Sequence, residues 1–190
     1  MRSCFMLGLA AAVLTITVTG AAKAATVVPP ACSPANVTTS TACLTVPGNN
    51  DNLASMNAGT GVFGNTDWLL ADKSDDAAPS LPAVNLSFDG LGLLTGNWQV
   101  GSFGGYTKAA LVVKGGSVAW VAYFLDLTHL SGTWSTSGIL NGGGNQPGLS
   151  HLSLYVADYV APPAPVPLPA GVVLLLAALG ALVPLRKRGA

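Results

Sequence analysis

The 190-residue chain contains no glutamate and few charged residues of any kind. Only 8% of its residues are charged, against about 25% in a typical soluble domain. Together with a hydrophobic content of 50%, this scarcity argues against an ordinary cytosolic enzyme and against a disordered charged tail. The 23 glycines and 13 prolines follow no Gly-X-Y period, which excludes collagen and predicts many turns. The length leaves room for one folded domain between the two ends.

Positive charge is scarce in the middle of the chain. Residues 25–160 hold three lysines (Lys73, Lys108 and Lys114) and all eight aspartates, so their formal charge is −5. A protein that binds nucleic acid needs a basic face to displace the counterions of phosphate. The composition therefore excludes nucleic acid as the main partner.

Residues 1–24 have the features of a secretory signal peptide. Arg2 supplies a positive start, residues 5–18 form an apolar run, and Ala22-Lys23-Ala24 offers the small-x-small pattern at which signal peptidase cuts. We expect cleavage after Ala24. The alternative is an uncleaved N-terminal anchor.

The C-terminal region has three parts in a fixed order. Residues 161–169 contain five prolines in nine positions, which favours a stiff, extended linker. Residues 170–185 are almost purely apolar and predict one transmembrane helix, although a helix over 168–185 spans only about 27 Å of a hydrocarbon core of roughly 30 Å. A basic stop follows, which the positive-inside rule keeps in the cytoplasm with the body outside: Arg186, Lys187 and Arg188.

The junction of linker and apolar run carries a five-residue motif: Val166, Pro167, Leu168, Pro169 and Ala170. With the helix and the basic stop, residues 166–190 resemble the VPLPA variant of the PEP-CTERM class of bacterial sorting signals. The resemblance implies a partner, an exosortase-type membrane protease that recognises the motif, cuts near it and releases or transfers the body to the cell surface. The alternative is a simple C-terminal membrane anchor on a proline-rich stalk.

Three cysteines are present, and Cys4 leaves with the signal peptide. Cys32 and Cys43 remain as a lone pair in an exported, oxidising setting, which predicts a disulfide. The alternative is two free thiols.

Residues 25–160 show short β-branched and aromatic runs separated by Gly, Asn, Asp and Pro, and no convincing helical period. We expect strands at 66–72, 83–88, 97–102, 107–114, 117–125, 133–139 and 149–156. The fold class predicted is therefore all-β, an antiparallel β-sandwich or jelly-roll-like domain. Gly115 and Gly116 predict a two-residue hairpin loop between two nearly continuous apolar strands, which places that hairpin centrally in the sheet.

A short pattern occurs twice, 36 residues apart: Leu-Thr-Gly-Asn-Trp at 94–98 and Leu-Ser-Gly-Thr-Trp at 130–134. Two copies are too few for a solenoid. We interpret them as two equivalent strand starts, each of which places a tryptophan in the core.

No catalytic pattern stands out. His129 and His151 lack metal-ligand partners at close spacing and are expected on the surface or on an edge strand. The G-x-G-x-x-G match at 59–64 lacks the strand and helix that a dinucleotide site requires. Weak calcium candidates lie in one loop (Asp72, Asp75 and Asp76) and in a second loop at 49–52, where solvated turn residues are the alternative.

The four tryptophans could form a sugar-stacking platform, but each lies in a strand-like run, where aromatic side chains pack inward. The sequence therefore favours a non-enzymatic, exported surface or extracellular-matrix protein without a cofactor. The alternative function is a module that binds carbohydrate (exopolysaccharide), and a secreted hydrolase comes third. Convergence of Trp and Asp side chains on one exposed face would favour the carbohydrate module.

Overall fold

A computed structural model describes residues 32–161, 163 and 174. The expected signal peptide, the expected sorting motif and its basic stop, and all but residue 174 of the expected membrane helix, lie outside the described residues. Within the part of the chain that is described, no helix is both long and apolar enough to cross a membrane.

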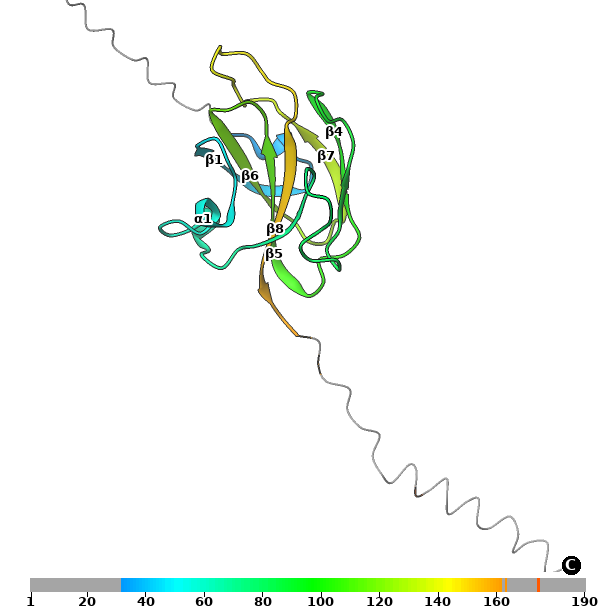
Figure 1. Cartoon of the computed structure of the whole chain (residues 1–190). Coiled ribbons are helices and arrows are strands. Elements are labelled where there is room, and N and C mark those ends of the chain that lie inside the picture. The colour runs from blue at the N-terminus through cyan, green and yellow to red at the C-terminus, as the bar shows by residue number, and fades with distance from the viewer. Residues whose placement is uncertain (1–31, 162, 164–173, 175–190) are drawn as a thin grey trace, which may run out of the picture.

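The body consists of two antiparallel sheets (Figure 1), which confirms the all-β prediction. The larger sheet has the order β1 (Ser40–Pro47), β6 (Ala119–Leu125), β5 (Tyr106–Lys114), β8 (His151–Tyr159) and β2 (Leu69–Lys73). The smaller sheet has the order β3 (Leu86–Phe88), β4 (Thr95–Val100) and β7 (Ser131–Ser135). The described helices are short: α1 (Leu53–Met56), η1 (Pro34–Asn36) and η2 (Val62–Gly64).

The larger sheet is buried on both faces. Because side chains alternate along a strand, Leu111 and Val113 of β5 join the core between the two sheets, together with Trp98 of β4. Ala110 and Val112 point to the other face and pack with residues of the segment 51–68. Figure 1 shows α1, which belongs to this segment, on the side of the larger sheet opposite β4 and β7. Burial on both faces explains why the β5–β6 strands are apolar almost without interruption.

All seven expected strands form, with ends shifted by a few residues, and β1 is an eighth that the sequence interpretation missed. The β5–β6 hairpin is central in the sheet, as expected, but the prediction that its loop has two residues is wrong. Lys114 pairs with Trp120, and β6 begins only at Ala119, so the connection is longer. Gly116 has a φ of +68°, and the Lys114 ammonium donates to the Ala119 carbonyl across the loop, at 3.2 Å.

The two copies of the repeat pair with each other in β4 and β7. Gly96 lies opposite Trp134, and Trp98 lies opposite Gly132. Both tryptophans are 1% exposed, which confirms that the repeat marks two equivalent strands with a tryptophan in the core. The Val100 amide, just after the first copy, donates to the carbonyl of Leu130, which begins the second copy. The Thr136 amide, just after the second copy, donates in the same way to the carbonyl of Leu94, which begins the first.

A disulfide joins Cys32 to Cys43, as the sequence predicts. It ties the start of the described chain to the middle of β1, and both cysteines pack against the core between the sheets.

Candidate functional site

None of the four tryptophans is available at the surface. Trp68, Trp98, Trp120 and Trp134 are all 1% exposed or less. The prediction that they belong to the core is confirmed, and no stacking platform of tryptophans exists in the described body.

The three weak calcium candidates do not converge. The Asp72 carboxylate accepts hydrogen bonds from the backbone amides of Lys73 and Leu86, at 2.8 Å each. Asp75 forms an ion pair with Lys73 at 3.5 Å instead. Residues 32–161, 163 and 174 contain no group of three His, Cys, Asp or Glu side chains placed to hold a metal ion.

The G-x-G-x-x-G segment forms a tight turn around η2. Gly61 has a φ of +73°, and a Cβ there would stand 1.6 Å from the Asn65 carbonyl oxygen. Its glycines serve this turn, and the next regular element, β2, is a strand rather than a helix.

The segment 51–68 covers one face of the larger sheet and is called the cover segment below. A buried hydrogen-bonded cluster joins this cover segment to the larger sheet. Asp51 is only 3% exposed. Its Oδ1 atom lies 2.5 Å from Nε2 of His151. The Tyr155 hydroxyl donates to Asp51 Oδ2 at 3.3 Å. Sequence positions about a hundred residues apart thus meet in one site.

Local structure places these three side chains. His151 and Tyr155 are four positions apart on β8, so both point to the face that carries the cover segment. Asn52 caps α1 by a capping box with Ser55, which holds the preceding residue, Asp51, above that face. The expectation for His151 is wrong, because β8 lies inside the sheet between β5 and β2 and the residue is 9% exposed. His129 does lie at the surface, with its side chain 55% exposed.

The electrostatics of the cluster follow from burial and from Asp51. Burial opposes ionisation of Asp51, but the hydrogen bond from His151, the nearby Ser153 hydroxyl and the charge of Lys73 outweigh it, so the Asp51 pKa falls below its ordinary value. Burial and then the Asp51 charge raise the pKa of Tyr155 far above its ordinary value. Burial lowers the pKa of Lys114, against the attraction of Asp51.

An open pocket of about 560 Å³ adjoins this cluster and exposes Asn52, Leu53 and Lys73 around Asp51. Both carboxylate oxygens of Asp51 are engaged by neighbours on β8. The arrangement therefore fastens the cover segment to the sheet, and the pairing of Asp51 with His151 serves that attachment.

A second, smaller pocket of about 430 Å³ lies on the outer face of the smaller sheet. Its polar lining comes from alternate positions of three strands, whose other positions carry the buried Leu86, Trp98 and Trp134. The outward side chains are short and hydrogen-bonding: Ser87, Asp89, Asn97, Gln99, Ser131 and Thr133.

The sequence interpretation missed both regions. For the buried cluster, the usable signal was the alternation of His151, Ser153 and Tyr155 along one strand. The polar face depends on the register of three strands, which no local pattern gives.

No family model matches the chain, and neither a curated protein nor a solved structure matches it.

Proposed function

We propose that the chain is a non-enzymatic bacterial protein, exported and displayed at the cell surface or in the extracellular matrix by a VPLPA-type sorting tail. The observation that carries the proposal is a compact all-β body closed by the Cys32–Cys43 disulfide. Disulfides form and persist in oxidising, extracytoplasmic compartments. This agrees with the signal peptide at 1–24 and with a membrane helix at 170–185 whose basic stop stays in the cytoplasm.

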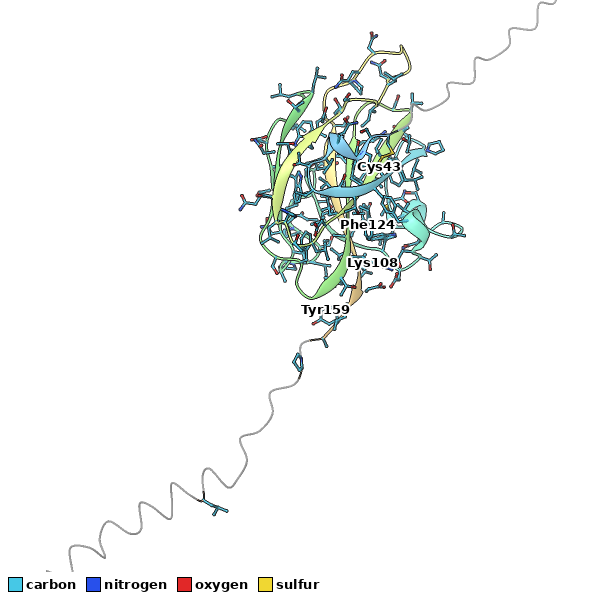
Figure 2. All side chains as sticks on the ribbon, turned by 180° about the vertical axis from the view of Figure 1, so that it is seen from behind. Cys43, Lys108, Phe124 and Tyr159 are labelled. Carbon is cyan, nitrogen blue, oxygen red and sulfur yellow. A yellow bond between two sulfur atoms is a disulfide. The ribbon has the colours of Figure 1, made fainter. Side chains whose placement is uncertain are left out.

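The folded body ends with β8, and the proposed sorting tail follows it in the chain. Figure 2 marks Tyr159, the last residue of that strand, at the point where the chain leaves the body. The five prolines of residues 161–169 predict an extended linker, which at about 3.1 Å per residue would reach roughly 28 Å. Such a linker holds the body clear of the membrane and presents residues 166–170 to an exosortase-type membrane protease at the outer surface.

The test is to replace Pro167 and Pro169 by alanine in the full chain and follow its size and location by fractionation. We expect export to continue and processing to stop, because the fixed, extended peptide that the protease recognises is lost. Replacing Pro162 and Pro163 by alanine is the matched control and should leave processing intact. Processing of the Pro167/Pro169 variant at the wild-type rate would reduce the tail to a simple anchor.

Binding of polysaccharide is the second candidate function. Because the tryptophans are buried, stacking of sugars on them does not support this function. The polar outer face of the smaller sheet supports it in another way, since its side chains can form hydrogen bonds with sugars.

A further inference from the structure

The outer face of the smaller sheet carries its polar side chains in rows that run across the strands. Ser87 of β3 lies opposite Gln99 of β4, which lies opposite Ser131 of β7. The next row contains Asp89, Asn97 and Thr133, since Asn97 lies opposite Thr133 and donates hydrogen bonds to the Asp89 carboxylate. At about 4.8 Å between strands, each row extends roughly 10 Å. All six side chains belong to exposed residues.

This face is almost free of charge. Asp89 is the one ionisable residue that lines the pocket, and its carboxylate already accepts from the backbone and side-chain nitrogens of Asn97, at 2.6 and 2.8 Å. No lysine lines the pocket. An anionic ligand, such as a phosphate or an acidic polysaccharide, would find no cation there.

The side chains also argue against a protein partner. The centres of protein interfaces are rich in aromatic and other large apolar anchors. Here the outward positions are Ser, Thr, Asn, Gln and Asp, and the one lining aromatic besides the buried Trp98, Phe88, is half-buried against the core. Hydroxyl and amide groups both donate and accept hydrogen bonds, which matches a ligand made of many neutral hydroxyls.

We propose that this outer face of β3, β4 and β7 binds an uncharged polysaccharide. The polymer lies across the strands in the open groove, and the Gln99 amide and the Ser131 hydroxyl bond its hydroxyl groups. Asn97, held by Asp89, presents a preorganised amide beside them. The proposal deepens the second candidate function and relies on the proposed surface display only for access to a polymer outside the cell.

The experiment is affinity gel electrophoresis of the full chain in a detergent without sugar groups. The gels contain dextran, laminarin or galactomannan as neutral polymers, or alginate as an anionic one. We expect at least one neutral polymer to retard the protein and alginate to leave its mobility unchanged. Replacing Gln99 and Ser131 together by alanine should weaken binding roughly tenfold, the effect of losing two net hydrogen bonds.

The matched control replaces Asn49 and Thr60, two exposed residues outside both pockets, by alanine and should bind as wild type does. Circular dichroism shows that each variant is folded. The proposal is overturned when none of the three neutral polymers retards the protein, when alginate retards it equally, or when the Gln99/Ser131 variant binds as wild type does. Fractionation of the same variant reports on export separately, so loss of binding with normal processing leaves the sorting proposal standing.

Discussion

Each glycine of the internal repeat provides room for the tryptophan of the other copy. A Cβ at Gly96 would lie 2.6 Å from the Trp134 ring, and one at Gly132 would lie 2.8 Å from Trp98 Nε1. Both tryptophans fill the core between the sheets, so the strand pair closes only where the opposite residue lacks a side chain. The repeat therefore encodes a contact that is made twice, once by each copy.

Replacing Gly132 by alanine should destabilise the body by about 1–3 kcal/mol, the usual effect of overpacking a core. The new methyl group would also meet the Thr38 hydroxyl at 2.5 Å, and Thr38 accepts a hydrogen bond from the Thr133 amide. Urea unfolding followed by tryptophan fluorescence measures the effect. Gly101→Ala is the control, because a Cβ there has nothing within 4 Å. Equal midpoints for the two variants would contradict the argument.

At the scale of the elements, the segment 51–68 is joined to β8 by the Asp51 cluster as well as by apolar packing. The Asp51 pKa is lower in the folded body than its ordinary value of 3.8, so ionised Asp51 stabilises the fold at pH values above about 4. This stabilisation disappears as the pH falls through the lower, folded pKa. The hydrogen bond with His151 and the charge of Lys73 both favour the ionised form of Asp51.

We therefore expect Asp51→Asn to cost about 1.5–3 kcal/mol at pH 7, as the loss of hydrogen bonds to a charged group does, and to flatten the loss of stability between pH 5 and pH 2. Urea midpoints measured across that range test both expectations. Asp126→Asn is the control, because Asp126 is exposed and its lowered pKa comes from bonds to Thr128 within the same turn. An acid profile for Asp51→Asn as steep as that of wild type would refute the attachment.

Strands that contain at least one buried residue were predictable from the sequence, and β1, which contains none, was not. The strands β5, β6 and β8 can be recognised in the sequence by their apolar runs and by alternation, because both faces of these strands are covered. β1 pairs with one neighbour only and has no fully buried residue, so its sequence lacks an apolar stripe. The hairpin loop was misjudged because two glycines suit a tight turn wherever they occur, and the register decides which turn forms.

The candidate sites depend on pairings across long stretches of sequence. Asp51 meets His151 because the cover segment crosses the face of β8, which neither sequence neighbourhood indicates. The row of Ser87, Gln99 and Ser131 joins three separate strands and exists only in one register. By contrast, each tryptophan could be assigned to the core from its own strand, because alternation within one strand is local information.

At the scale of the whole molecule, the last strand of the body is an interior strand. On one side, β8 pairs with β5 along its whole length, from Tyr159 opposite Tyr106 to His151 opposite Lys114. On its other side, β8 pairs with β2. The chain leaves the body just after Tyr159, the last residue of β8 (Figure 2). Lys108, on β5, forms an ion pair with Asp158 at 2.8 Å, next to this exit.

Single-molecule pulling can test how this arrangement resists load. A handle at Ser117→Cys, beyond the far end of β5, and a second handle on the tail stretch the β5–β8 ladder lengthwise, so that its bonds share the force. A handle at Ser102→Cys, near the Tyr159 end, opens the same ladder one pair after another. Both serines are exposed. We expect the Ser117 geometry to rupture at the higher force, and equal forces would show that the ladder does not carry the load.

The position of β8 has a mechanical consequence for a body held by its tail. Drag on the body reaches the chain first at Tyr159, and a pull along the strand sets β8 in shear against β5 and β2 together. An edge strand in the same place would peel away from a single neighbour. With the tether fixed to an interior strand, tension on the tail loads the β5 ladder from Tyr159 and the β2 ladder from Val156 inward, so two ladders share it.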